Sequence, residues 1–225
     1  MHTELYLEAH KGRSLRVRAS GGLTVRQTGR DVLHLISSAA TPLGGDRIDI
    51  HVDVRSGAVL TLRSVAAAIA LPGRCDTVSD MSWHITVADG ATLIVDPQPT
   101  IVAGDAVHHT QCTVEIAGSG EFRFCERVQV GRRGEDAGRW SGRMSVDIAG
   151  TAALRHQLRL GRPDTDSLSS PSVLLSEYRY PDSRPDTVHP TATAARLGLV
   201  AGGSMTTVLA NTLTAADRTA AELVG

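Results

Sequence analysis

The sequence predicts a mainly β fold of stacked two-strand units, with short helical segments near the C-terminus. Two observations predict it. Apolar and polar residues alternate with period two over long stretches, which is typical of half-buried strands rather than helices. Small-residue turns separate these stretches, and their glycines recur at intervals of 35, 33, 30 and 30 residues: Gly22, Gly57, Gly90, Gly120 and Gly150.

The clearest strand is the segment 47–55. Its even-numbered residues are apolar and its odd-numbered residues are polar. Successive side chains of a strand point to opposite faces of the sheet. One face of this strand is therefore predicted to pack in the core while the other faces water.

Four of the turns join two predicted strands each: 48–54 with 58–65, 83–87 with 91–95, 107–116 with 121–130, and 140–148 with 152–160. A unit of two strands cannot bury its apolar face alone, so such units are expected to stack as in a β-helix or β-solenoid. A β-sandwich with hairpins at regular spacing fits the periodicity equally well.

We expect one domain over residues 1–225, because a single β domain of this length can bury a substantial core. Its strand-rich core is predicted over about 13–160. After Leu160, five prolines and many Ser and Asp residues predict loops. The Ala- and Leu-rich end predicts a helix over about 215–223 with Thr214 as its N-cap, so the part 161–225 is expected to be loop-rich and partly helical.

Charge and composition narrow the possible partners and the compartment. The formal net charge is −1 and the basic residues do not cluster, which argues against nucleic acid or a membrane surface as a partner. The first 15 residues lack a basic segment followed by an apolar one, and no later stretch is long and apolar enough to span a bilayer. A cytoplasmic location is expected, and three cysteines without CxxC spacing fit reduced thiols.

Catalytic motifs are absent from the sequence. It has no GxxxxGK[ST] loop, no GxGxxG after a strand, no GxSxG elbow and no HExxH. We therefore expect a protein that is not an enzyme and has no tightly bound cofactor.

Several histidines are candidate metal ligands. Adjacent strand residues face opposite ways, so of His108 and His109 only His109 would share a face with Glu115. His51 and His84 each lie six residues before a turn glycine, so stacked units would bring their imidazoles together as a transient metal site. The competing interpretation is that these are ordinary surface or core histidines.

One carboxylate falls on an otherwise apolar strand face. Glu126 is in phase with Phe122, Phe124, Val128 and Val130, where an ionised group needs a partner or water. A salt bridge to an interior arginine is the structural interpretation, and an internal polar path is the functional one.

A set of landmarks in fixed order resembles a known family, the urease accessory proteins of the D type, called H in some bacteria. The landmarks cover about residues 15–160: Pro42-Leu43-Gly44-Gly45-Asp46-Arg47, Gly57-Ala58-Val59-Leu60-Thr61-Leu62 with the Ala-rich segment to Ala70, Asp89-Gly90-Ala91-Thr92-Leu93-Ile94-Val95-Asp96-Pro97-Gln98-Pro99-Thr100-Ile101, Glu126 with Gly131-Arg132, and Gly138-Arg139-Trp140-Ser141-Gly142-Arg143.

The resemblance implies a stack of β-strands related to a β-helix with a little helix near the C-terminus, which favours the stacked arrangement over the β-sandwich. It also implies a scaffold or chaperone in urease maturation that binds apo-urease and accessory protein F and, through F, the GTPase G that brings nickel. On this view Asp46 and Glu126, with Asp96 as a third candidate, line an internal polar route for nickel in transit. The alternative is that these carboxylates only hold the fold through buried arginine pairs.

Two other functions compete with this one. A small cupin-like metal-dependent enzyme is motivated by His108, His109 and Glu115, but the sequence lacks the His-x-His pair and the later Gly/Pro and His motif that a cupin needs. A generic β-repeat binding module accounts for the periodicity but not for Gly44-Gly45-Asp46 occurring together with Pro97-Gln98-Pro99.

Overall fold

The computed structural model describes residues 1–132, 134–161 and 171–224, which form two large sheets that enclose one main core. Sheet A contains β1 (His2–Ala9), β2 (Arg16–Ser20), β5 (Arg47–Val54), β8 (Val78–Val87), β11 (Val107–Ile116), β13 (Arg139–Ile148) and β14 (Thr151–Leu160). Its spatial order is β14-β13-β11-β8-β5-β1-β2.

Sheet B contains β3 (Leu23–Gly29), β4 (Val32–Ser37), β6 (Val59–Ser64), β7 (Ala68–Ala70), β9 (Thr92–Val95), β10 (Thr100–Val102), β12 (Glu121–Val130), β15 (Val173–Tyr180), β16 (Thr187–Val188), β17 (Ala194–Gly198) and β18 (Ser204–Ala210). Its main order is β16-β17-β18-β15-β12-β9-β6-β4-β3, and β7 and β10 pair in parallel beside β12.

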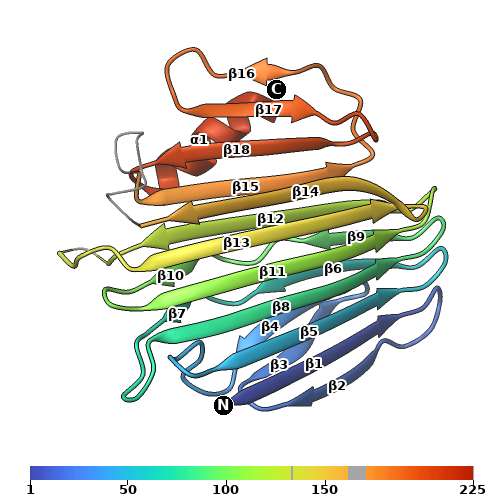
Figure 1. Cartoon of the computed structure of the whole chain (residues 1–225). Helices are drawn as coiled ribbons and strands as arrows, with labels where there is room; N and C mark the ends of the chain where they lie inside the picture. Colours follow the sequence, from blue (N-terminus) through green and yellow to red (C-terminus); the bar gives the residue numbers. More distant parts are fainter. Residues whose placement is uncertain (133, 162–170, 225) are drawn as a thin grey trace.

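The middle of the molecule is a β-solenoid-like stack of coils. Strands β5, β8, β11 and β13 are parallel neighbours, with Val107 of β11 opposite both Val78 of β8 and Arg139 of β13. Strands β6, β9 and β12 repeat the arrangement in sheet B, so each coil takes about 30 residues. Hairpins would have made consecutive strands antiparallel partners, and the parallel stacking in Figure 1 confirms the solenoid prediction.

The turns between the two sheets depend on glycine. Gly57 and Gly90 have φ values of +67° and +64°, in the left-handed region that residues with a Cβ rarely adopt. Each lies where the chain leaves sheet A for sheet B. Gly57 and Gly90 therefore mark coil corners.

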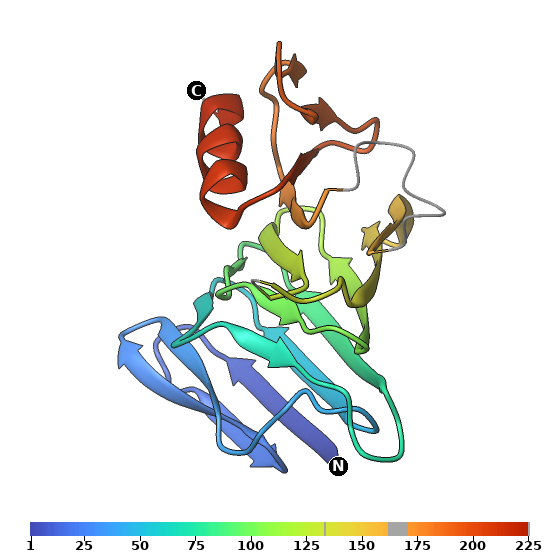
Figure 2. The ribbon, with the colours of Figure 1, turned by 90° about the vertical axis from the view of Figure 1, so that its left-hand side faces the viewer.

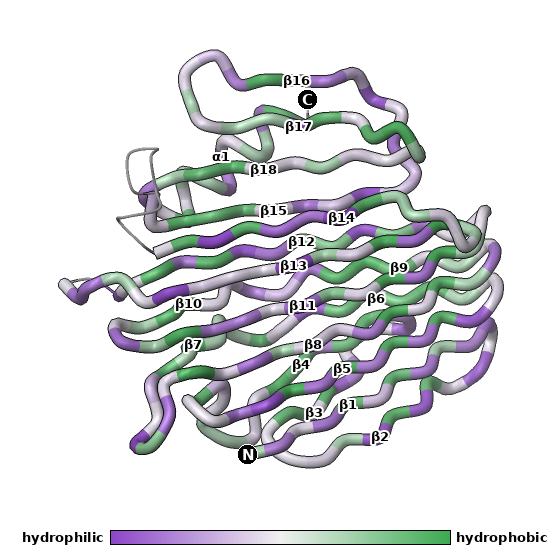
Figure 3. The backbone as a smooth tube through the Cα atoms, in the orientation of Figure 1, coloured by the Kyte–Doolittle hydropathy of each residue, from purple (hydrophilic) through white to green (hydrophobic). Residues whose placement is uncertain are grey.

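The core fills the space between the sheets. Strands alternate between apolar and polar residues along the tube in Figure 3, and the apolar positions are those that are buried. Burying a side chain of this size contributes roughly 1.5–3 kcal/mol relative to exposure. The central contributors from the two sheets include Leu5, Ile50, Trp83, Leu60, Leu93 and Phe122.

The fourth predicted unit is not a coil. Segments 140–148 and 152–160 pair with each other, because β13 and β14 form an antiparallel hairpin inside sheet A. Its two-residue turn has positive φ at both Ala149 and Gly150, +48° and +76°, which is the conformation that folds a strand back on its neighbour. The prediction for this unit was wrong because sequence spacing does not report the φ of Ala149.

The C-terminal part has more strand than the sequence predicted. Strand β15 pairs with β12 and β18 pairs with β15, both antiparallel, so sheet B continues through residues predicted as loop. The prolines that indicated loops lie outside these strands, for example Pro171 and Pro181 on either side of β15. The part of this prediction that concerns 162–170 lies outside the described residues.

The first strand and the C-terminal helix both begin earlier in the sequence than predicted. Strand β1 begins at His2, so the strand-rich part does not start at 13. The predicted helix is present as α1 (Leu213–Val224), and it lies beside β15, β17 and β18 (Figure 2). Its cap is Thr212, whose Oγ1 accepts a hydrogen bond from Ala215 N at 3.2 Å, rather than Thr214. No helix in the described part of the chain is long and apolar enough to cross a bilayer.

Candidate functional site

The inner face of sheet A is apolar along most of its length and polar at one end. There the inward residues are Asp46, Ser79 and His108: Ser79 and His108 are opposite one another on β8 and β11, and Asp46, just before β5, accepts a backbone hydrogen bond from Asp80 N, the residue after Ser79. The three inward residues are 6%, 1% and 0% exposed. With Thr110, the next inward residue of β11, and its partner Glu126 they form what we call the polar end of the interior.

Asp46 is held by three donors. It accepts hydrogen bonds from Thr41 Oγ1 and Leu43 N at 2.9 Å and from the amino group of Met1 at 2.7 Å. Burial opposes its ionisation, but the hydrogen bonds from these donors outweigh burial and hold the pKa of Asp46 below its usual range. The loop before it is tight, since a Cβ at Gly44 would collide with the backbone of the 73–76 turn.

His108 is completely buried and only half satisfied. Its Nδ1 lies 2.9 Å from Ser79 Oγ, whereas Nε2 has no hydrogen-bond partner among the described residues. Burial, together with the neighbouring His109, lowers the pKa of His108 to about 4, so the ring is neutral at pH 7. Trp140, opposite His108 on β13, also has a buried Nε1 without a partner in the described part of the chain.

Glu126 faces a cavity between the sheets. Its Oε1 accepts a hydrogen bond from Thr110 Oγ1 at 2.8 Å. The cavity measures about 210 Å³ and is lined mainly by apolar side chains, among them Trp83 and Phe124. Burial raises the pKa of Glu126 to about 7, and the Thr110 hydrogen bond offsets this only in part.

Asp96 belongs to a different arrangement. Its Oδ1 lies 2.7 Å from Arg127 Nη1, and the same guanidinium donates to Asp217 of α1 at 2.8 Å. Arg127 also lines the cavity that Glu126 faces. Asp96 therefore lies near the cavity through Arg127, and this arginine ties the solenoid to the C-terminal helix.

The three predicted carboxylates do not form one site. Glu126 lines the cavity and Asp96 pairs with Arg127 of its wall, whereas Asp46 lies just before β5 and is not among the residues that line the cavity. Within the described ranges, neither Asp46 nor Glu126 pairs with an arginine, so the arginine-pair interpretation fits Asp96 alone.

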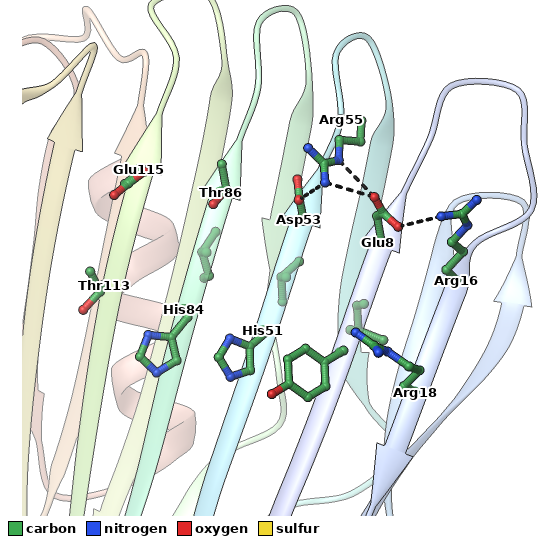
Figure 4. A pocket seen from close by; sticks show the side chains of 14 residues that line it. Glu8, Arg16, Arg18, His51, Asp53, Arg55, His84, Thr86, Thr113 and Glu115 are labelled. Carbon is green, nitrogen blue, oxygen red and sulfur yellow. Dashed lines mark hydrogen bonds and ion pairs between the residues drawn. The ribbon is translucent and has the colours of Figure 1, made fainter.

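On the outer face of sheet A, His51 and His84 are neighbours, as the stacking of units predicted. They are opposite one another on β5 and β8, and their rings stack with centroids 4.7 Å apart and planes 15° apart (Figure 4). Stacked imidazoles direct their nitrogen lone pairs side by side rather than toward one point. A shared metal would require the rings to turn, and the metal role of this pair stays a prediction.

His109 and Glu115 cannot share a metal. Both lie on the one continuous strand β11, and six residues of extended strand separate them by about 20 Å. His109 Nδ1 instead lies 3.2 Å from Asp80 Oδ1 on the neighbouring strand. No group of three or more metal-ligating side chains occurs in the part of the chain that the structure describes, so nothing favours a cupin-like centre.

Comparison with known proteins adds an independent finding. The family model described as UreD urease accessory protein matches residues 3–179. The chain belongs to the UreD family of urease accessory proteins. It is 34% identical over 208 residues to urease accessory protein UreD 1 of Saccharopolyspora erythraea, covering 91% of this chain and 82% of that protein.

Two further UreD relatives are matched over less of their length. The UreD protein of Frankia alni is 37% identical over 158 residues, covering 63% of this chain and 53% of the relative. That of a Parafrankia species is 32% identical over 197 residues, covering 76% and 66%. The chain therefore spans about half to two thirds of these two UreD proteins.

Three residues of the candidate site were not predicted from the sequence, namely Ser79, Thr110 and Arg127, and His108 was weighed only as the alternative to His109. A signal existed for His108, which is in phase with the buried Cys112 and Val114 of β11. No sequence signal marked Arg127, because its partners Asp96 and Asp217 are distant along the chain.

Proposed function

We propose that this UreD family member is a non-catalytic scaffold that binds apo-urease and accessory protein F and, through F, the GTPase G, while nickel is inserted into urease. Family membership supports a role in urease maturation, and the relatives are named accessory proteins. The bridging role and the cytoplasmic location come from the resemblance and the composition described above.

Exposed sheet edges support a scaffold. Strands β2 and β14 end sheet A, and β3 and β16 end sheet B. Edge strands present unpaired backbone groups to which a partner can add, and the apolar side chains of Val17 on β2 and Val188 on β16 are 41% and 69% exposed. Partner binding would cover such edges.

We further propose that nickel is cargo, without a tightly bound cofactor, and moves along the polar end of the interior toward apo-urease. The main support for this proposal is that Glu126 faces a cavity between the sheets and has no arginine partner among the described residues. Carboxylate and hydroxyl oxygens bind nickel more weakly than nitrogen or sulfur ligands would, which suits release. Asp46 would act at the other end of this path, and Asp96 would position Arg127 at the cavity wall.

The scaffold is tested by co-purification. Removing the gene from a urease-producing host should leave apo-urease without nickel, and a tagged copy should restore activity and recover urease together with F and G. Expressed alone, the protein is expected to self-associate, and co-expression with accessory protein F should restore a defined complex. Full nickel loading without the protein would contradict the scaffold.

The route is tested by Asp46→Asn and Glu126→Gln, which keep the shape of the side chains. Intact complexes with reduced nickel content and urease activity are expected. Glu121→Gln is the matched control, since Glu121 is an exposed carboxylate at the start of the same strand as Glu126. Loss of complex and nickel together, or no change in either, would contradict the route.

A further inference from the structure

The outer face of sheet A carries a ladder of flat groups that lies apart from the polar end of the interior. The Tyr6 ring stacks on His51 with centroids 4.4 Å apart and planes 6° apart, and His51 stacks on His84 at 4.7 Å. At the other end the guanidinium of Arg18 lies over Tyr6, 5.0 Å from the ring centroid. We call Arg18, Tyr6, His51 and His84 the ring ladder.

The ring ladder is closed at one end and open at the other. Its steps match the spacing of neighbouring strands, about 4.8 Å, because one residue per strand contributes each step. The next strand, β11, places Thr113 opposite His84. Threonine is too short to continue the stack, so the exposed face of His84 borders a groove of about 780 Å³ (Figure 4).

An unpaired carboxylate lies beside the open step. Glu115 is two residues beyond Thr113 on the same face of β11, is exposed, and has no hydrogen bond or ion pair within the described ranges. The other acids of the groove are already paired: Arg55 lies 3.0 Å from Glu8 and 2.7 Å from Asp53. The free negative charge of the groove is therefore at the open end of the ring ladder.

We propose that this groove binds an arginine side chain of a protein partner, with its guanidinium stacked on His84 over Thr113 and paired with Glu115. The inference rests on the proposed function for the nature of the partner, and it adds the chemistry of one contact. The molecule itself shows the same chemistry at the closed end of the ladder, where Arg18 covers Tyr6.

The geometry favours arginine over lysine and over a metal ion. A guanidinium is flat and stacks on rings, whereas an ammonium is a compact charge that gains nothing from the ladder spacing. A metal needs converging lone pairs, and the parallel rings of His51 and His84 do not provide them. Burial and the neighbouring His84 lower the pKa of His51, which disfavours a positive charge on the ring beside His84.

The test uses Nα-acetyl-arginine methylamide as the probe and the full chain with isotope-labelled histidines. Saturable shifts of the His84 imidazole signals are expected, larger than those of His51, with affinity in the millimolar range. Nα-acetyl-lysine methylamide should shift them much less. No saturable shift at His84, or equal responses to the two probes, would overturn the proposal.

Variants locate the contact. Glu115→Gln should weaken probe binding about three- to fivefold, as expected for an exposed ion pair. Thr113→Tyr should fill the open step and abolish binding while leaving the circular dichroism spectrum unchanged. Glu121→Gln, on the other sheet, is the control that should bind the probe normally. Normal probe binding by Thr113→Tyr would refute the stacked position.

Recovery of the maturation complex separates this inference from the proposed function. Thr113→Tyr should reduce recovery of a partner protein with the tagged chain, and the probe should compete with that partner for the wild type. Probe binding without any effect on complex recovery would overturn the protein-partner assignment. Failure of the proposed function would appear differently, as full nickel loading of urease in the absence of the protein.

Discussion

The interior between the two sheets and the outer face of sheet A carry similar side chains under very different conditions. Inside, Asp46, His108 and Glu126 are removed from most water, and each has a pKa displaced by its surroundings. Outside, His84 and Glu115 are exposed. A buried polar group that lacks a full set of partners destabilises the fold, so its presence requires a compensating role, whereas an exposed group requires none. The energetic cost of burial therefore points to a role for the inner residues, whereas only their arrangement points to a role for the outer ones.

The largest difference between the faces should appear when one carboxylate is removed from each. Asp46→Ala leaves the Thr41 hydroxyl, the Leu43 amide and the Met1 amino group without their acceptor, and should lower the free energy of unfolding by about 2–4 kcal/mol. Glu115→Ala should change it by less than about 0.5 kcal/mol. Urea unfolding monitored by circular dichroism measures both. Equal losses would remove the distinction between the faces.

The pH dependence of stability should sharpen the comparison at Glu126. Its folded-state pKa of about 7 lies above the ordinary value of 4.5. Below the ordinary value both folded and unfolded forms are protonated and burial costs nothing. As the pH rises the unfolded state ionises first, so stability falls until the folded pKa is passed.

At 1.36 kcal/mol per pKa unit, the loss from this group approaches about 3 kcal/mol above pH 7. Glu126→Gln should therefore be more stable than the wild type at pH 8 and nearly equal to it at pH 4, in urea titrations at both pH values. Glu121→Gln should show no such dependence. A constant difference between wild type and Glu126→Gln would mean that folding does not raise the pKa of Glu126.

The ring ladder should contribute a smaller amount. Tyr6→Ala removes the stacking of Tyr6 on His51 and its contact with Arg18, and should lower the free energy of unfolding by about 1 kcal/mol. Tyr6→Phe keeps the ring and should be close to neutral. A loss as large as that of Asp46→Ala would indicate that the outer face supports the fold rather than a partner.

Cysteine reactivity should distinguish buried from exposed positions without the use of destabilising variants. Cys75 is exposed, whereas Cys112 and Cys125 are buried and burial raises the pKa of both thiols. Brief treatment of the native protein with iodoacetamide should label Cys75 alone, as read by mass spectrometry of peptides. Rapid labelling of Cys112 would show that the core opens to solvent.

Sequence periodicity predicted the coils because strand alternation and turn glycines are local signals. It predicted that His51 and His84 meet, since a fixed repeat converts sequence position into spatial register. It failed at the β13–β14 hairpin and along β15 and β18, where the conformation of one turn and pairing between distant strands decide the structure. It also paired His109 with Glu115 because they share a face of β11, although six residues of extended strand keep them too far apart to bind one metal.

The role of the polar end of the interior as a nickel path is the central claim, and it is tested most directly by the rate of nickel transfer. Complexes of apo-urease, this protein and accessory proteins F and G would be loaded with radioactive nickel, and its appearance in urease followed over time. Glu126→Gln should slow transfer roughly tenfold, a loss of about 1.4 kcal/mol, while Glu121→Gln transfers at the wild-type rate. Equal rates for Glu126→Gln and the wild type in intact complexes would contradict the account.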